Sequence, residues 1–93
     1  MNFKSKLNYI FESMGLSNVE VARIGGIDAS LISRFRTGKR IPSKGSRQIY
    51  CLCRGLIMAA QEHEALDQLC ALCKINAVND IESFTDQLLR WFE

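Results

Sequence analysis

Four cysteines, at positions 51, 53, 70 and 73, are the residues of this chain best suited to bind a metal. C-x-C and C-x-x-C pairs occur in structural zinc sites. Residues two apart on a helix point to nearly opposite sides, so a tetrahedral site could take only one of Cys51 and Cys53. Cys53, Cys70 and Cys73 fit the apolar stripes of predicted helices, where free cysteine packs like a small hydrophobe. We therefore expect packing cysteines, no metal and no cofactor; a metal-binding or redox-sensing role is the alternative.

His63, the only histidine, stands among acidic residues, with no serine or cysteine arranged around it in a nucleophile motif. The chain also has no phosphate-cradling glycine loop, no metal-spaced carboxylate cluster and no nucleophile elbow. We expect His63 to be an exposed surface residue and the protein not to be an enzyme.

Basic residues gather in the first part of the chain. The net charge is only +2, yet residues 1–54 carry ten of the twelve Lys and Arg residues and three acids, whereas residues 55–93 carry two bases and seven acids. Between Asp28 and Glu62 there is no acid, and the bases there are Arg34, Arg36, Lys39, Arg40, Lys44, Arg47 and Arg54. Such a surface attracts the phosphates of nucleic acid. A solvated basic surface without a partner is the alternative.

Apolar residues recur at helical spacing along the chain, and no useful length alternates with a period of two. The pattern predicts an all-α fold of five or six helices. We expect helices over residues 3–14, 18–25, 29–37 and 46–60, a fifth helix or a continuation of the fourth over 62–74, and a last helix from Asn79 or Asp80. A chain of 93 residues suffices for one domain. It has no apolar run of about 20 residues and no signal-like start, so we expect a cytoplasmic protein without a membrane partner.

Residues 17–40 carry the local signals of two short helices joined by a tight turn. Ser17 and Glu20 form a capping box at the first helix, and Asp28 is the expected N-cap of the second. Gly26 can adopt the positive φ that the turn requires. Counted from position 18, the small and apolar residues fall at the spacing of a helix-turn-helix: Ala22 fifth, Gly26 ninth, Ile27 tenth, Ile32 fifteenth and Phe35 eighteenth.

With residues 26–42, GIDASLISRFRTGKRIP, this spacing resembles the phage-repressor and Cro-like (XRE-like) helix-turn-helix regulators, over roughly residues 5–60. The resemblance implies a lambda-repressor-like DNA-binding core over residues 1–60, with residues 61–93 as a helical extension packed on the same domain. In that family the position before the turn glycine is usually apolar, whereas this chain has Gly25. We therefore expect the first helix of the motif to end early or to turn differently.

The resemblance also implies roles for single residues, because the second helix of the motif enters the major groove in this family. Carried over by position, the base-reading residues are Ala29, Ser30, Ser33 and Arg34. The guanidinium fork of Arg34 can bond to guanine O6 and N7, a pairing that discriminates between bases by about 1–3 kcal/mol. Phosphate contacts are expected from Asn18, Arg36, Thr37, Lys39, Arg40 and Lys44.

These features predict a sequence-specific transcriptional regulator, by resemblance a repressor, with double-stranded DNA as its partner. The last predicted helix carries a large apolar face: Ile81, Phe84, Leu88, Trp91 and Phe92. In the favoured interpretation this face completes the core, and in the other it forms a homodimer interface. A protein-interaction module and a DNA-binding antitoxin are the alternative functions. An effector or protein partner would act through a region that the sequence does not identify.

Overall fold

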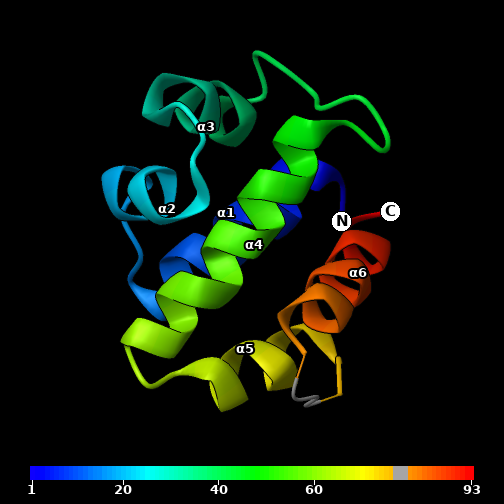
Figure 1. The fold of residues 1–93 in the computed structure, drawn as a ribbon. Coiled ribbons are helices and arrows are strands. Elements are labelled where there is room, and N and C mark those ends of the chain that lie inside the picture. The colour runs from blue at the N-terminus through cyan, green and yellow to red at the C-terminus, as the bar shows by residue number, and fades with distance from the viewer. Residues whose placement is uncertain (77–79) are drawn as a thin grey trace.

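The computed structural model describes residues 1–76 and 80–93, and no strand occurs among them. In chain order, the helices are α1 (Phe3–Met14), α2 (Asn18–Gly25), α3 (Ala29–Thr37), α4 (Arg47–Glu62), α5 (Leu66–Cys73) and α6 (Ile81–Phe92) (Figure 1). The prediction of an all-α fold with five or six helices is confirmed. Of the two predicted starts for the last helix, Asp80 is the N-cap of α6, and Asn79 lies outside the described residues.

The long helix α4 runs through the middle of the molecule, with α2 and α6 packed on different sides of it (Figure 1). Its side chains Leu52, Leu56 and Ile57 have no exposed surface. The helix α3 packs on α1 and α2, and its Phe35 is also fully buried. Apolar packing thus holds α3 by one face only, and this fixes which of its side chains point to solvent.

The predicted capping residues set the ends of α2 and α3. Ser17 Oγ accepts a hydrogen bond from the Glu20 N–H at 3.1 Å, and Asp28 Oδ1 accepts one from the Ser30 N–H at 2.9 Å. Between the helices Gly26 has φ +71°, a left-handed conformation that a residue with a Cβ adopts only at a cost. These local signals place the turn between α2 and α3.

Gly25 is the last residue of α2 and the left-handed turn residue is Gly26, so the expectation that the helix ends early or turns differently at Gly25 is wrong. It is buried against Gly55 of α4. A Cβ on Gly25 would lie 2.6 Å from the Cys51 carbonyl oxygen and 3.0 Å from the Gly55 Cα. A Cβ on Gly55 would lie 2.9 Å from the Val21 carbonyl oxygen. The backbones of α2 and α4 therefore touch where they cross, and this approach requires glycine at both positions.

The C-terminal helices complete the core. α4 and α5 are separate helices, because α4 ends at Glu62 and Glu64 has φ +55°. Leu88 of α6 is fully buried, and the Phe92 ring lies 5.1 Å from the Phe3 ring of α1. This packing agrees with the favoured interpretation of the last apolar face. The homodimer interface stays a prediction.

All four cysteines are free thiols: Cys53 and Cys73 are buried, and Cys51 and Cys70 are half-buried. Burial raises the pKa of the Cys53 thiol and raises that of Cys73 to about 12. Both thiols are therefore protonated at neutral pH and are poor nucleophiles. In the described part of the chain, no three His, Cys, Asp or Glu side chains are grouped to hold a metal ion. No helix there has the length and apolar character to cross a bilayer.

His63 lies at the surface, as predicted, and joins the end of α4 to the start of α2. Its Nε2 donates to Glu20 Oε2 at 2.6 Å. This hydrogen bond, helped by the Ser17 backbone N–H, holds the pKa of Glu20 below its ordinary value of 4.5. A carboxyl group whose pKa is lowered by folding stabilises the fold above its ordinary pKa. That contribution is lost as the pH falls through the lowered value.

We expect Glu20→Gln to lower the melting temperature at neutral pH, and the difference from the wild type to shrink as the pH falls below 4.5 and through the lowered pKa of Glu20. Melting curves recorded across the acid range measure this, with Glu12→Gln as a control for an exposed glutamate of α1. A difference between wild type and Glu20→Gln that stays constant from neutral pH into the most acidic range in which both proteins fold would contradict the assignment.

Candidate nucleic-acid interface

The helix α3 presents one polar face to solvent. Its buried side chains are Leu31, Ile32 and Phe35. Its exposed polar side chains are Ser30, Ser33, Arg34 and Thr37, at the i, i+3, i+4, i+7 spacing of a single helix face. Three of the four predicted base-reading residues therefore share this face. The fourth, Ala29, is half-buried and packs against the core, so only part of its methyl group is accessible.

A short chain of hydrogen bonds links the side chains at the start of α3. Asp28 Oδ1 accepts from both the Ser30 N–H and the Ser30 Oγ, each at 2.9 Å. These bonds lower the pKa of the exposed Asp28 carboxyl, so it carries a full negative charge at neutral pH. The Arg34 guanidinium in turn donates to Ser30 Oγ at 3.3 Å. Arg34 is thereby directed along the helix toward the N-terminal turn, and its long hydrogen bond is weak enough to be exchanged for a ligand acceptor.

Arg36, a predicted phosphate contact, is half-buried and bonds to side chains of the protein itself. Its Nε donates to Asn8 Oδ1 at 2.7 Å, and its NH1 donates to Asn18 Oδ1 at 2.8 Å. The guanidinium carbon lies 4.3 Å from the centroid of the Phe11 ring, within the range of a cation–π interaction. Asn8 Nδ2 also donates to the Arg36 carbonyl oxygen at 2.8 Å. Arg36 therefore ties α3 to α1 and α2, and Asn8 is a residue of this region that sequence reasoning missed.

The Arg36 network also orients Asn18. Because Asn18 Oδ1 accepts from Arg36, the Asn18 Nδ2 donor, at the first residue of α2, is directed away from that bond. Thr37 Oγ1 donates to the Arg34 carbonyl oxygen at 3.2 Å, so the Thr37 hydroxyl gives a hydrogen-bond partner to a carbonyl group in the last turn of α3. Asn18 and Arg36, two predicted phosphate contacts, thus lie together, at the junction of three helices.

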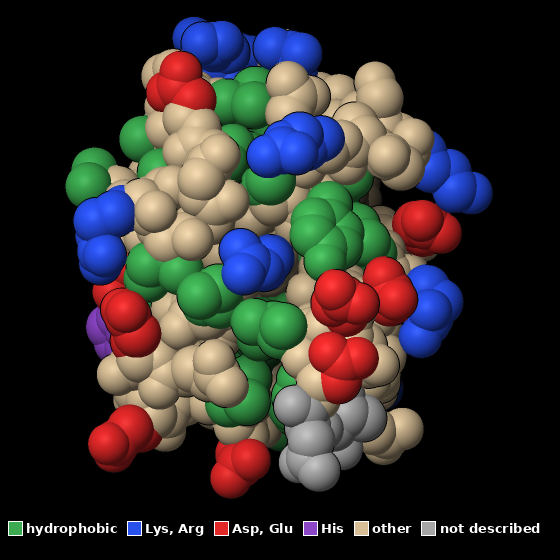
Figure 2. Space-filling model, in the orientation of Figure 1, with side chains coloured by type: hydrophobic (Ala, Val, Ile, Leu, Met, Phe, Trp, Pro, Cys, Tyr) green, Lys and Arg blue, Asp and Glu red, His purple; other side chains and the backbone are tan. Residues whose placement is uncertain are grey.

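The remaining predicted phosphate contacts lie in the loop after α3. Lys39, Arg40 and Lys44 are exposed, and Lys44 Nζ lies 3.9 Å from Glu93 Oε2. Figure 2 shows Lys and Arg side chains at the top of the molecule, over α3 and this loop, and most Asp and Glu side chains in the lower half. The uneven charge of the sequence therefore becomes an uneven charge on the surface, with the basic side next to the polar face of α3.

Comparison of the chain with protein-family models, with curated protein sequences and with solved structures found no match. Function must therefore be inferred from the residues and their geometry.

We expect Arg36→Ala to destabilise the protein by about 1–3 kcal/mol, because it removes two charged hydrogen bonds and leaves Asn8 and Asn18 without their partner. For a chain of this size, each kcal/mol corresponds to a melting-temperature change of about 4–8 °C. Thermal unfolding measures the effect, and Arg40→Ala is the matched control, because Arg40 is exposed. Equal melting temperatures for Arg36→Ala and Arg40→Ala would show that the network does not stabilise the fold.

Proposed function

We propose that the protein is a sequence-specific DNA-binding transcriptional regulator that represses by occupying its operator. In this proposal α2 and α3 form a helix-turn-helix within a lambda-repressor-like domain, and α3 enters the major groove. One observation carries it: the only polar face of α3 that points to solvent contains Ser30, Ser33 and Arg34, and the basic loop follows directly. Side chains on a protruding helix read the edges of the DNA bases through hydrogen bonds, and flanking Lys and Arg side chains hold the phosphates.

The individual roles follow from what each side chain can donate. Arg34 bonds to guanine through its fork, for which it must release only the 3.3 Å bond to Ser30 Oγ. Ser30 and Ser33 donate to or accept from neighbouring bases, and the accessible part of the Ala29 methyl meets a thymine methyl. These roles place sequence discrimination chiefly on Arg34, because a serine hydroxyl can adapt to several bases.

The phosphate contacts form two groups in this proposal. Asn18 Nδ2 and the first N–H groups of α2 hold one phosphate, with Arg36 holding Asn18 in place and offering its remaining N–H groups. Lys39, Arg40 and Lys44 of the loop hold phosphates on the other side of α3, and Thr37 lies between the two groups. The protein acts in the cytoplasm by binding rather than by catalysis.

A homodimer suits this mode of binding. Two copies related by a two-fold axis place two α3 helices in successive major grooves, about 34 Å apart on a palindromic site. The acidic residues of the C-terminal half, seven between positions 55 and 93, would be repelled by the DNA phosphates. The dimer contact is therefore expected on the side away from DNA. Light scattering of the protein with and without a palindromic duplex measures the stoichiometry.

We expect Lys39→Ala to weaken binding to all duplexes by the same factor, because a phosphate contact carries no sequence information. The slope of log K against log salt concentration should also fall by about 1. Fluorescence anisotropy over a series of salt concentrations measures both quantities. Arg90→Ala, which removes a base of α6, is the control and should change neither. If Lys39→Ala instead weakens binding to some DNA sequences more than to others, Lys39 contacts a base rather than a phosphate.

A further inference from the structure

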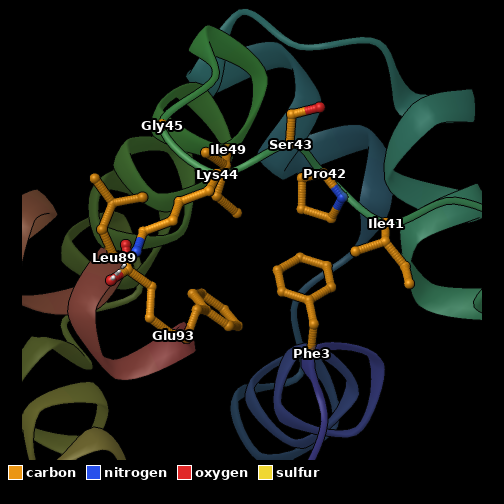
Figure 3. Close-up of a pocket in the computed structure, with 10 residues that line it drawn as sticks. Phe3, Ile41, Pro42, Ser43, Lys44, Gly45, Ile49, Leu89 and Glu93 are labelled. Carbon is orange, nitrogen blue, oxygen red and sulfur yellow. Dashed lines mark ion pairs between the residues drawn. The ribbon is translucent and has the colours of Figure 1, made fainter.

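A cavity of about 320 Å³ opens between the loop after α3, the start of α1 and the end of α6 (Figure 3). Its walls are mainly apolar and come from four segments: Phe3, Ile41, Pro42, Ile49, Leu89 and Phe92. In Figure 3 the Phe3 ring points into the cavity beneath Pro42, and Ser43 directs its hydroxyl away. The volume lies in the range of small-molecule sites, which are mostly apolar with a few polar groups at defined places.

Ile41 is the most exposed apolar residue that lines this cavity. Its side chain is 77% exposed although it is large and apolar. A ligand that fills the cavity would remove both the Ile41 side chain and its own apolar surface from water, which is the main source of affinity in such sites. A ligand with an apolar body therefore fits the walls.

The rim of the cavity indicates the charge of the ligand. Lys44 extends along one side toward Glu93, and their charged atoms lie 3.9 Å apart with 83% and 50% of the side chains exposed (Figure 3). Exposed pairs of this kind contribute little, so another carboxylate can take the place of Glu93. A neighbouring hollow shares Phe3 and Ile41 and is lined by Lys4 and Arg40. The two hollows are therefore lined by three basic side chains and by one acidic side chain, that of Glu93.

We propose that this cavity binds a small amphipathic carboxylic acid, with its apolar body against Phe3, Ile41 and Ile49 and its carboxylate on Lys44 in place of Glu93. Resting on the proposed function, we further propose that the ligand releases DNA. Its carboxylate adds one negative charge beside Lys44 and leaves that of Glu93 unpaired, and its body lies against the loop that holds Lys39 and Arg40. The acid would therefore act as an inducing effector.

The binding half is tested on the full chain by calorimetric titration with hexanoate, octanoate and decanoate. Saturation is expected with a Kd on the order of 1 mM or lower for the longer acids. Affinity should rise about fourfold for each added CH₂ until the cavity is filled. Octanol and octylamine, which lack the carboxylate, should bind more weakly than octanoate. Absence of saturable binding, or affinity that does not depend on chain length, would overturn the proposal.

Two variants assign the binding to this cavity. Ile41→Ser changes an exposed side chain, so folding should be kept while octanoate affinity falls about tenfold or more, as expected for removing several apolar carbons from the contact. Lys44→Gln should abolish the preference for octanoate over octanol. Octanoate binding that is unchanged in both variants would show that the acid binds elsewhere and would overturn the assignment.

The regulatory half is tested by measuring DNA affinity of the wild type with and without saturating octanoate. Weaker DNA binding with octanoate, and no such effect of octanoate in Ile41→Ser, is expected. Octanoate that binds the cavity without changing DNA affinity would overturn the inducer role. A protein that binds no duplex in either condition would contradict the proposed function itself, whereas the calorimetric titrations would still decide the ligand site.

Discussion

Gly25→Ala and Gly55→Ala should each destabilise the protein by about 1–3 kcal/mol, although alanine is intrinsically the better helix former. The added methyl group would lie 2.6 Å from the Cys51 carbonyl oxygen in the first variant and 2.9 Å from the Val21 carbonyl oxygen in the second. These atoms belong to helix backbones, so relief requires α2 to move away from α4. Melting temperatures should fall by about 4–8 °C for each kcal/mol.

The control for these variants is Gln61→Ala, because Gln61 is exposed on α4 and should change stability by no more than about 0.5 kcal/mol. The double variant adds a sharper test. Once one methyl group has separated α2 from α4, the second costs less, so the two effects should sum to more than the effect of the double variant. A melting temperature that is unchanged or raised in either single variant would contradict the close crossing of the two helices.

Arg34→Ala should relax sequence preference more than any other substitution on α3. The ratio of affinities for the preferred site and for the same site with its contacted guanine replaced should fall by about fivefold to 150-fold, which corresponds to about 1–3 kcal/mol. Gel shifts with the two duplexes measure this ratio. Arg34→Lys is the matched variant, because lysine keeps the positive charge but cannot form the two parallel bonds.

We expect Arg34→Lys to keep most of the non-specific affinity and to lose most of the preference. Arg54→Ala, on α4, should keep the preference. If Arg34→Ala leaves both affinity and preference untouched, Arg34 does not read a base.

The ends of α2 and α3 could be predicted because their signals are local. A capping serine, a capping aspartate and a turn glycine act within a few residues of themselves, so the sequence pattern contains both partners of each interaction. Gly25 is different. Its partner Gly55 lies on another helix, and only the crossing of α2 and α4 explains why a glycine stands where the resembling family usually has an apolar residue.

The candidate interface also contains residues that could be predicted from the sequence and contacts that could not. Ser30, Ser33 and Arg34 are predicted by position from the family resemblance, and their common solvent face in the structure agrees with helical periodicity. The contacts of Arg36 could not be predicted, because Asn8 and Asn18 lie on α1 and α2 and nothing in the local sequence connects them to Arg36. The cavity beside Ile41 is also invisible in the pattern, since its walls come from four separate segments.

Selection of bound duplexes from a random DNA pool tests most directly whether α3 reads the major groove. We predict a palindromic consensus whose half-sites are one helical turn apart or a multiple of it, about 34 Å for one turn. Each half-site should contain a guanine whose enrichment disappears when the selection is repeated with Arg34→Ala. A pool with no enriched sequence, even at low salt, would contradict DNA reading by α3 and would favour a protein-interaction module.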